Sequence, residues 1–139
     1  WNNVRCSGYV AQEQMTLRTD ARRYEAGSFN ILGITGLNAA LGLLLEVGID
    51  TIAVDLTAKR AWLVDALQAK GFDVLFPETQ SGITSCSCQG TDMKALGETL
   101  AAANVVASVR TERSGRDYLR FSPHYYNTPA ELERALELL

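Results

Sequence analysis

The chain has 139 residues, of which 47% are apolar and 21% charged, and its formal net charge at pH 7 is −3. This length and composition predict one globular domain that buries roughly two thirds of its extended surface. The small negative charge gives no reason to expect nucleic acid or an anionic membrane as a partner. The single histidine argues against a metal site, and three cysteines, an odd number, favour reduced thiols in a cytoplasmic protein.

The first 27 residues show no sustained hydrophobic period, and the chain begins with Trp1 rather than methionine. A polar, irregular stretch of this length is long for a loop inside a compact domain. We therefore expect residues 1–27 to be a connector from a missing neighbouring domain, and residues 28–139 to form the domain itself.

Two helices are predicted after the connector. The first begins at Asn30 as N-cap, ends at Gly48 and has an apolar stripe at helical spacing. The stripe contains Ile31, Ile34, Leu37, Leu41, Leu44 and Leu45. Polar and small residues interrupt this stretch, so it is not predicted to span a membrane. The second helix covers roughly residues 51–70 and ends at Gly71.

The hydrophobic period then changes to that of short strands bounded by Gly, Pro and Ser. Strands are predicted at residues 72–76, 82–87, 105–110 and 117–122, and a helix capped by Thr91 at 91–104.

The last helix has the clearest start signal in the chain. Thr128 and Glu131 form a capping-box pattern, with Pro129 at the first helical position. The order α-α-β-β-α-β-β-α predicts an α+β fold, an antiparallel sheet of about four strands with helices packed on one face.

Two positions are candidates for binding. Arg120 alternates with Leu119 and Phe121 along its strand, so it faces away from the core; there it is either a solvated arginine, the commoner case, or a planar fork for a carboxylate. Ser28 lies just before a helix start, where a hydroxyl and the helix dipole favour an anion, although simple capping and turn formation is the commoner case.

Other reactive side chains carry less signal. His124 has no carboxylate or nucleophile at a recognisable spacing, so it reads as structural. Cys86 and Cys88 are too close for the usual zinc or redox spacing and read as buried thiols, without a role that the sequence assigns.

Two motifs, in order, resemble the C-terminal part of class V aminotransferases. These pyridoxal-phosphate (PLP) enzymes of fold type I include cysteine desulfurases, selenocysteine lyases and isopenicillin N epimerase-like proteins. The first motif is "RRYEAGSFNILGITGLNAAL" at 22–41, and the second is "LRFSPHYYNTPAELERALELL" at 119–139. Between them, "GFDVLFP", "SGITS" and "VVASVR" fall in the expected order.

The resemblance implies roles for individual residues. Arg120 matches the arginine that binds the α-carboxylate of an amino-acid substrate. Ser28 would reach the PLP phosphate of the partner subunit in a homodimer, and Asn30 would help to shape that loop. Tyr126, Asn127 and Thr128 match the turn before the last helix.

The resemblance also implies what this chain lacks. The lysine that holds PLP as a Schiff base belongs to a large N-terminal domain, whose end Trp1 resembles. Lys59, Lys70 and Lys94 fall on predicted helices and are no substitutes. The chain alone is therefore expected to bind no PLP and to be inactive.

Cysteine desulfurases place a nucleophilic cysteine on the loop before the substrate arginine. The corresponding loop here, residues 111–118, has none. The resemblance therefore favours an epimerase-like, transaminase-like or C–S lyase activity on an amino acid that the sequence does not identify. The alternative is a small non-catalytic α+β module that binds a ligand or partner through its sheet.

Overall fold

A computed structural model describes residues 17–25 and 27–139 of the chain. The expectations for Trp1 and Cys6 lie outside these residues. The chain divides into two compact units, Trp1–Glu46 and Val47–Leu139, which are described separately below.

The first unit contains one short and one long helix. The 3-10 helix η1 (Ala21–Tyr24) begins at Asp20, whose carboxylate accepts a hydrogen bond from the Arg22 N–H. Helix α1 (Ile31–Val47) begins where Asn30 Oδ1 accepts the Gly33 N–H at 2.9 Å, which confirms the predicted cap. It ends at Gly48, whose φ of +91° suits glycine. No residue of α1 is buried, so its apolar stripe stays largely exposed within the described residues of this unit.

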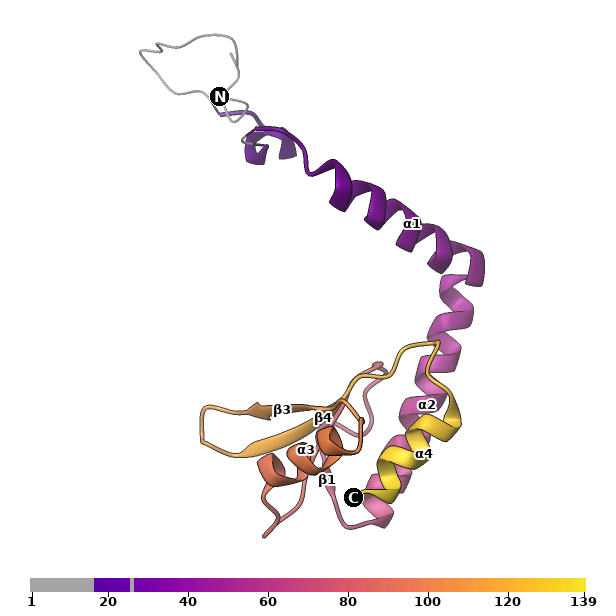
Figure 1. The fold of residues 1–139 in the computed structure, drawn as a ribbon, viewed down its shortest axis with the longest axis vertical. Coiled ribbons are helices and arrows are strands. Elements are labelled where there is room, and N and C mark those ends of the chain that lie inside the picture. Colours follow the sequence, from indigo (N-terminus) through magenta and orange to yellow (C-terminus); the bar gives the residue numbers. More distant parts are fainter. Residues whose placement is uncertain (1–16, 26) are drawn as a thin grey trace. The chain divides into compact units, whose positions relative to one another are not determined.

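The second unit is a four-stranded sheet with helices, and it contains the hydrophobic core (Figure 1). Its elements are α2 (Ile49–Ala69), β1 (Asp73–Val74), β2 (Thr84–Ser87), α3 (Met93–Ala102), β3 (Ser108–Thr111), β4 (Asp117–Phe121) and α4 (Pro129–Glu137). The strand order is β1-β2-β4-β3, and every neighbouring pair is antiparallel. The predicted α+β fold is confirmed.

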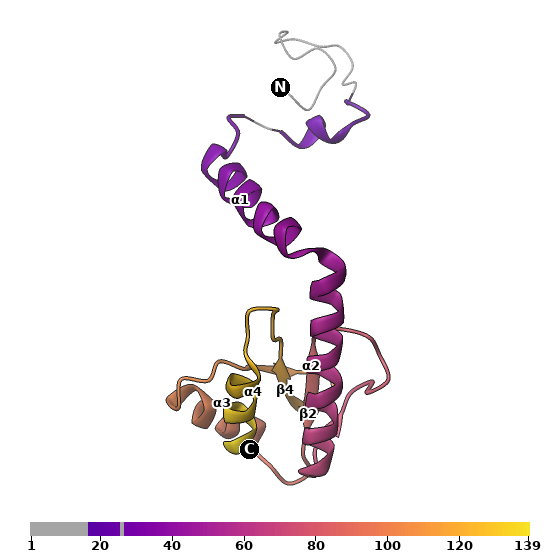
Figure 2. The same ribbon diagram turned by 90° about the vertical axis from the view of Figure 1, so that its right-hand side faces the viewer.

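The helices cover one face of this sheet, and the register explains why. Val74, Cys86, Leu119 and Val109 are cross-strand partners in one row; Cys86 and Leu119 belong to the core cluster, and the two valines pack against it. Helices α2 and α4 lie side by side (Figure 2), and Leu63 and Leu67 of α2 are fully buried in the same core.

Three strands, β1, β2 and β3, begin later than predicted. Before β1 and β3, the end of the preceding helix engages the backbone that was predicted to start the strand. Phe72 N–H bonds to Leu67 O at 3.0 Å, and Val105 N–H bonds to Leu100 O at 2.8 Å. Both bonds close a helix C-terminus across a left-handed residue, the arrangement of a Schellman motif. These N–H groups are therefore engaged by the helices rather than by the sheet.

The predicted cap of α3 is wrong by one residue. Asp92, not Thr91, is the N-cap, and its Oδ1 accepts hydrogen bonds from the N–H groups of Lys94 and Ala95 at 2.9 and 3.1 Å. A carboxylate caps a helix as well as a hydroxyl does and also suits the positive end of the dipole.

Among the described helices, none is by itself long and apolar enough to cross a membrane; α1 and α2 reach that length and apolarity only when taken together across their break.

Candidate functional site

Arg120 lies where strand alternation places it, on the sheet face opposite the core. Leu119 and Phe121 on either side of it are buried, whereas Arg120 is half-buried. Its cross-strand partners are Ser85 on β2 and Ser108 on β3. Arg120 therefore stands in the middle of a row of small polar residues, one position before β4 ends.

The guanidinium of Arg120 is incompletely hydrogen-bonded. Its Nε is buried and has no hydrogen-bond partner in the described chain, where no carboxylate lies within ion-pair distance of it. A buried N–H without an acceptor is unfavourable, and those that persist call for an explanation. A carboxylate is the group that a guanidinium binds best, through two parallel hydrogen bonds.

The turn after β4 is held by its own side chains. Asn127 Oδ1 accepts the His124 N–H at 2.8 Å, and the predicted capping box joins Thr128 to Glu131. The backbone N–H and hydroxyl of Thr128 lower the pKa of the Glu131 carboxyl below its ordinary value. Asn127 and Thr128 thus stabilise the turn between Arg120 and α4.

Three rings extend from this turn. His124 lies 4.8 Å from Tyr125 and stacks on Tyr126 at 4.9 Å between ring centroids, and the two tyrosines meet edge to face. His124 Nδ1 is buried without a hydrogen-bond partner. The histidine therefore belongs to an aromatic cluster close in sequence to Arg120.

Ser28 and Asn30 lie in the first unit, before α1, and Arg120 lies in the second. The side chains of Ser28 and Asn30 are exposed, and the amide of Asn30 caps α1. Their cofactor-binding roles remain predictions.

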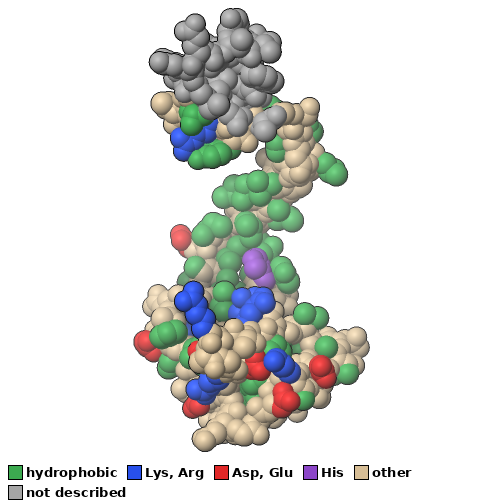
Figure 3. Space-filling model, turned by 90° about the vertical axis from the view of Figure 1, so that its left-hand side faces the viewer, with side chains coloured by type: hydrophobic (Ala, Val, Ile, Leu, Met, Phe, Trp, Pro, Cys, Tyr) green, Lys and Arg blue, Asp and Glu red, His purple; other side chains and the backbone are tan. Residues whose placement is uncertain are grey.

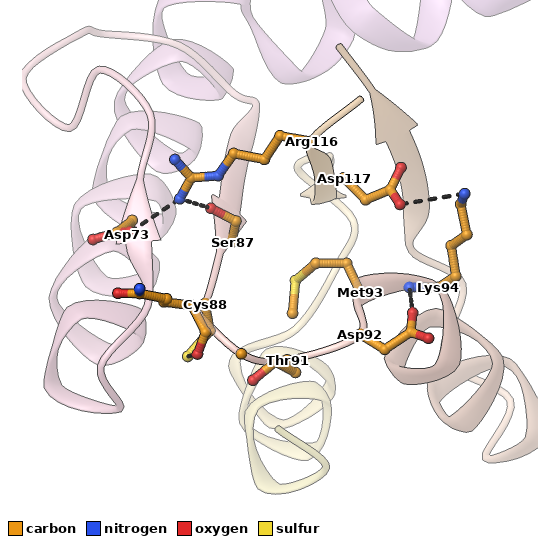
Figure 4. A pocket seen from close by; sticks show the side chains of 11 residues that line it. Asp73, Ser87, Cys88, Thr91, Asp92, Met93, Lys94, Arg116 and Asp117 are labelled. Carbon is orange, nitrogen blue, oxygen red and sulfur yellow. Dashed lines mark hydrogen bonds and ion pairs between the residues drawn. The ribbon is translucent and has the colours of Figure 1, made fainter. Parts of the chain in front are cut away.

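A surface cavity lies at the opposite end of β4 from Arg120. Its volume is about 680 Å³, and it opens among the end of β2, the start of α3 and the β3–β4 turn (Figure 4). None of the predicted binding residues lines it.

The charges of this cavity are paired with one another. Figure 4 shows Arg116 reaching Asp73 at 3.0 Å and Ser87 Oγ at 2.6 Å, and Lys94 reaching Asp117 at 3.3 Å. The Thr111 hydroxyl and Lys94 lower the pKa of Asp117. Because its cations already have acceptors, this cavity is a weaker anion site than the surroundings of Arg120.

The two described cysteines differ. Cys86 is fully buried on the core face, and burial together with the nearby Cys88 raises the pKa of its thiol to about 12, so it stays protonated at neutral pH. Cys88 is half-buried and lines the cavity. The predicted burial is confirmed for Cys86 and is wrong for Cys88, which is half-buried just after the end of β2.

Sequence reasoning missed two consecutive cations on α2. Lys59 pairs with Asp55 at 2.6 Å and donates to two carbonyl oxygens of the His124–Tyr125 turn, and Arg60 is almost completely buried. The i,i+4 spacing of Asp55 and Lys59 was the only signal, and it is equally typical of a solvated helix face.

Comparison with known proteins identifies the family. Residues 4–135 match the family model described as aminotransferase class-V. The chain belongs to the class V aminotransferases. A search of the curated proteins found no match.

Solved structures share this fold. The apo cysteine desulfurase of Thermococcus onnurineus NA1 has a TM-score of 0.79 at 19% identity, over 94% of this chain and 35% of that one. The cysteine desulfurase CsdA of Escherichia coli has a TM-score of 0.78 at 21% identity, over 94% and 35%. A C-DES variant with glycine covalently linked to its PLP cofactor has a TM-score of 0.73 at 20% identity, over 99% and 35%. This class V chain thus spans about a third of the length of each.

The residues described here fit PLP and its substrate only in part. Arg120, with an unpartnered Nε, suits a carboxylate, and the exposed hydroxyl of Ser28 suits a phosphate oxygen. Of the three lysines, Lys59 and Lys94 form ion pairs with Asp55 and Asp117, and Lys70 is the C-cap of α2.

Proposed function

We propose that this chain is the C-terminal, substrate-binding domain of a PLP-dependent class V enzyme that acts on an amino acid in the cytoplasm. The observation that carries the proposal is the placement of Arg120 at the end of β4, between two serines, with a buried Nε that lacks an acceptor. Family membership adds the expectation of amino-acid chemistry.

In this proposal Arg120 binds the substrate α-carboxylate and so fixes the orientation of the bonds at Cα. A rigid, bidentate contact holds the reacting Cα–H bond in one direction relative to the cofactor plane. When bound, PLP supplies an electron sink for the charge that develops at Cα. The proton itself is moved by a group outside this chain.

Ser28 takes the second role, as a hydroxyl donor to the PLP phosphate of a partner subunit in a homodimer. Asn30 supports it by capping α1, which holds the start of the helix in place. Because the described lysines are engaged or lie on α2, we expect the chain alone to be inactive and to give no stable, stoichiometric PLP absorbance when mixed with the cofactor.

Within the family we favour epimerase-like, transaminase-like or C–S lyase chemistry over persulfide formation. The hairpin turn between β3 and β4 contains no cysteine, and the thiol of Cys86 is buried with a pKa of about 12. Neither supplies a thiolate nucleophile next to Arg120.

The proposed partner of α1 is the N-terminal large domain of the same enzyme. Hydrophobic side chains line this helix in Figure 3, and Leu32 is 86% exposed. At about 100° per residue, Leu37 and Leu41 lie on one side of the helix and Leu32 and Leu43 on the other. A helix that is apolar on opposite sides belongs in the interior of a larger protein.

The carboxylate role is tested by Arg120→Ala in the full-length protein. We expect the apparent affinity for every amino-acid substrate to fall by about 10²-fold or more, because a charge-assisted contact of 1.5–3 kcal/mol is lost and the substrate carboxylate is left unpaired. Arg113→Ala, an exposed arginine of the hairpin turn, is the control. Unchanged affinity in Arg120→Ala would show that this role is wrong.

The role of α1 is tested by Leu37→Glu and Leu41→Glu, with Asn38→Glu as the matched control on the same helix. We expect the two leucine variants, and not the control, to lose association with a separately expressed N-terminal domain in size-exclusion chromatography. If the leucine variants instead lose only self-association, a second copy of the chain covers α1.

A further inference from the structure

Two consecutive cations of α2 hold two different loops by their backbone. Lys59 Nζ, on a side chain that is 11% exposed, donates to the carbonyl oxygens of His124 and Tyr125 at 3.4 and 3.1 Å and pairs with Asp55 at 2.6 Å. This ammonium therefore holds the turn that follows Arg120.

Arg60 holds the other loop. It is 3% exposed, and its Nη2 donates to Phe76 O at 2.7 Å and to Thr79 Oγ1 at 2.9 Å. Its Nε and Nη1 are buried without hydrogen-bond partners, and no carboxylate in the described chain forms an ion pair with it. A buried unpaired cation is unfavourable for folding, so stability alone does not account for Arg60.

Both loops leave the same end of the sheet. Residues 75–83 lead into β2 and residues 122–128 leave β4, and the first residue of β2, Thr84, is the cross-strand partner of the last residue of β4, Phe121. Arg120 immediately precedes Phe121 on β4. The two loops held by Lys59 and Arg60 therefore meet the sheet at the same end, where β4 carries the carboxylate-binding candidate.

These loops present aromatic rings to solvent. Tyr126 is 70% exposed and stacks on His124, and Phe76 is 68% exposed. Phe76 also has a φ of +47°, an unusual conformation for an aromatic residue, and its carbonyl oxygen is held by Arg60 and Thr79. The hydrogen bonds of α2 thus stabilise a backbone shape that leaves both rings uncovered.

We propose that Phe76 and Tyr126 bind the side chain of the amino-acid substrate, which is apolar or aromatic, and that Lys59 and Arg60 are positioning residues that hold the two loops in place. This proposal rests on the proposed function, in which Arg120 binds the carboxylate of the same substrate. Aromatic side chains together with a few fixed polar groups are the usual lining of a small-molecule site. Their faces and edges favour apolar and aromatic groups over charged anionic ones.

The experiment compares phenylalanine and alanine as probes in the full-length, PLP-loaded protein. Apparent dissociation constants are read from the visible absorbance of the bound cofactor, and KM and kcat are measured where turnover occurs. Tyr126→Ala and Phe76→Ala change exposed side chains, so they leave the core intact. We expect each to weaken phenylalanine relative to alanine by about tenfold, the order of effect of a lost apolar contact in a pocket, with kcat changing less than KM.

Lys59→Met and Arg60→Met are expected to shift the same ratio in the same direction, and Lys59→Arg to restore it, because arginine keeps a donor for the carbonyl oxygens. Hydrogen exchange in residues 122–128 should be faster in Lys59→Met. Lys70→Met is the control. It changes the lysine at the C-cap of α2 and should leave the ratio unchanged. Equal weakening of both amino acids by these variants, or no change in the ratio, would overturn the proposal.

The outcomes separate this proposal from the proposed function. If Arg120→Ala weakens both amino acids while the aromatic variants leave the ratio unchanged, the carboxylate role stands and the side-chain site is wrong. If the ratio shifts and Arg120→Ala has no effect, the side-chain site stands without the carboxylate role. A wild-type protein that binds neither amino acid overturns both.

Discussion

Helices α1 and α4 both carry leucines at helical spacing, yet only in α4 are some of them buried. In α4, Leu132, Ala135 and Leu136 are buried while charged residues occupy the other side. In α1 the only charged residue is Glu46, and nothing is buried. The sequence of an amphipathic helix predicts which of its sides faces the core. For a helix that is apolar on opposite sides, the sequence predicts only that other protein surfaces cover it.

The largest expected difference between the two units lies in deleting a buried leucine. Leu119→Ala removes a fully buried side chain from the central strand β4 and should lower the free energy of unfolding by about 2–5 kcal/mol. Leu37→Ala in α1 should change it by less than about 0.5 kcal/mol in the isolated chain, since surface changes rarely exceed this. Denaturant unfolding measures both. An equal loss for the two variants would mean that α1 has a core of its own.

Glycine substitutions test the same difference in packing between the two units. A Cβ at Gly97 of α3 would lie 2.6 Å from Val109 Cγ2, so the helix approaches β3 closely there. Gly97→Ala should destabilise the chain by about 1 kcal/mol, the overpacking penalty being partly offset by better helix propensity. Nothing lies within 4 Å of a Cβ at Gly36, so Gly36→Ala should raise helix content by circular dichroism without destabilising the unit Val47–Leu139.

Removing the N-cap should lower the unfolding free energy of the chain for α4 but only reduce local helix content for α1. Thr128→Ala breaks the capping box of α4, which packs in the core, and should lower the unfolding free energy by about 1 kcal/mol. Asn30→Ala removes the cap of α1 and should reduce helix content while the cooperative transition keeps its midpoint. A shifted midpoint in Asn30→Ala would couple the two units.

The smallest effect is a dependence on pH. Hydrogen bonds from Thr128 hold the folded-state pKa of Glu131 below its ordinary value of 4.5. The carboxylate therefore adds stability above that value, and this contribution is lost as the pH falls through the lower, folded-state pKa. Chain stability should accordingly drop on acidification, with a smaller drop in Glu131→Gln. Identical pH profiles for the two proteins would exclude a contribution from this capping box.

Fold class and element order were readable from the sequence because they depend on local patterns. Period-2 and period-3.6 hydrophobicity, Gly48, Gly71 and the Thr128 capping box each act over a few residues. The starts of β1 and β3 were predicted too early. The apolar residues Phe72 and Val105 fit a strand pattern, but their N–H groups bond to the ends of the preceding helices. The placement of Arg120 opposite the core was also readable, since side chains alternate along any strand.

Only the tertiary structure decided which residues surround that arginine. The pairing of Arg120 with Ser85 joins strands that are distant in sequence, so no local pattern specifies which strand lies beside β4. Lys59 and Arg60 look like members of a solvated helix face until the loops at 76–79 and 124–125 fold back onto α2. The sequence by itself determined the fold class and the candidate arginine, because these follow from local hydrophobic patterns and strand alternation, and two of its motifs indicated the family by resemblance. The contacts that would shape a binding site around it follow from long-range packing.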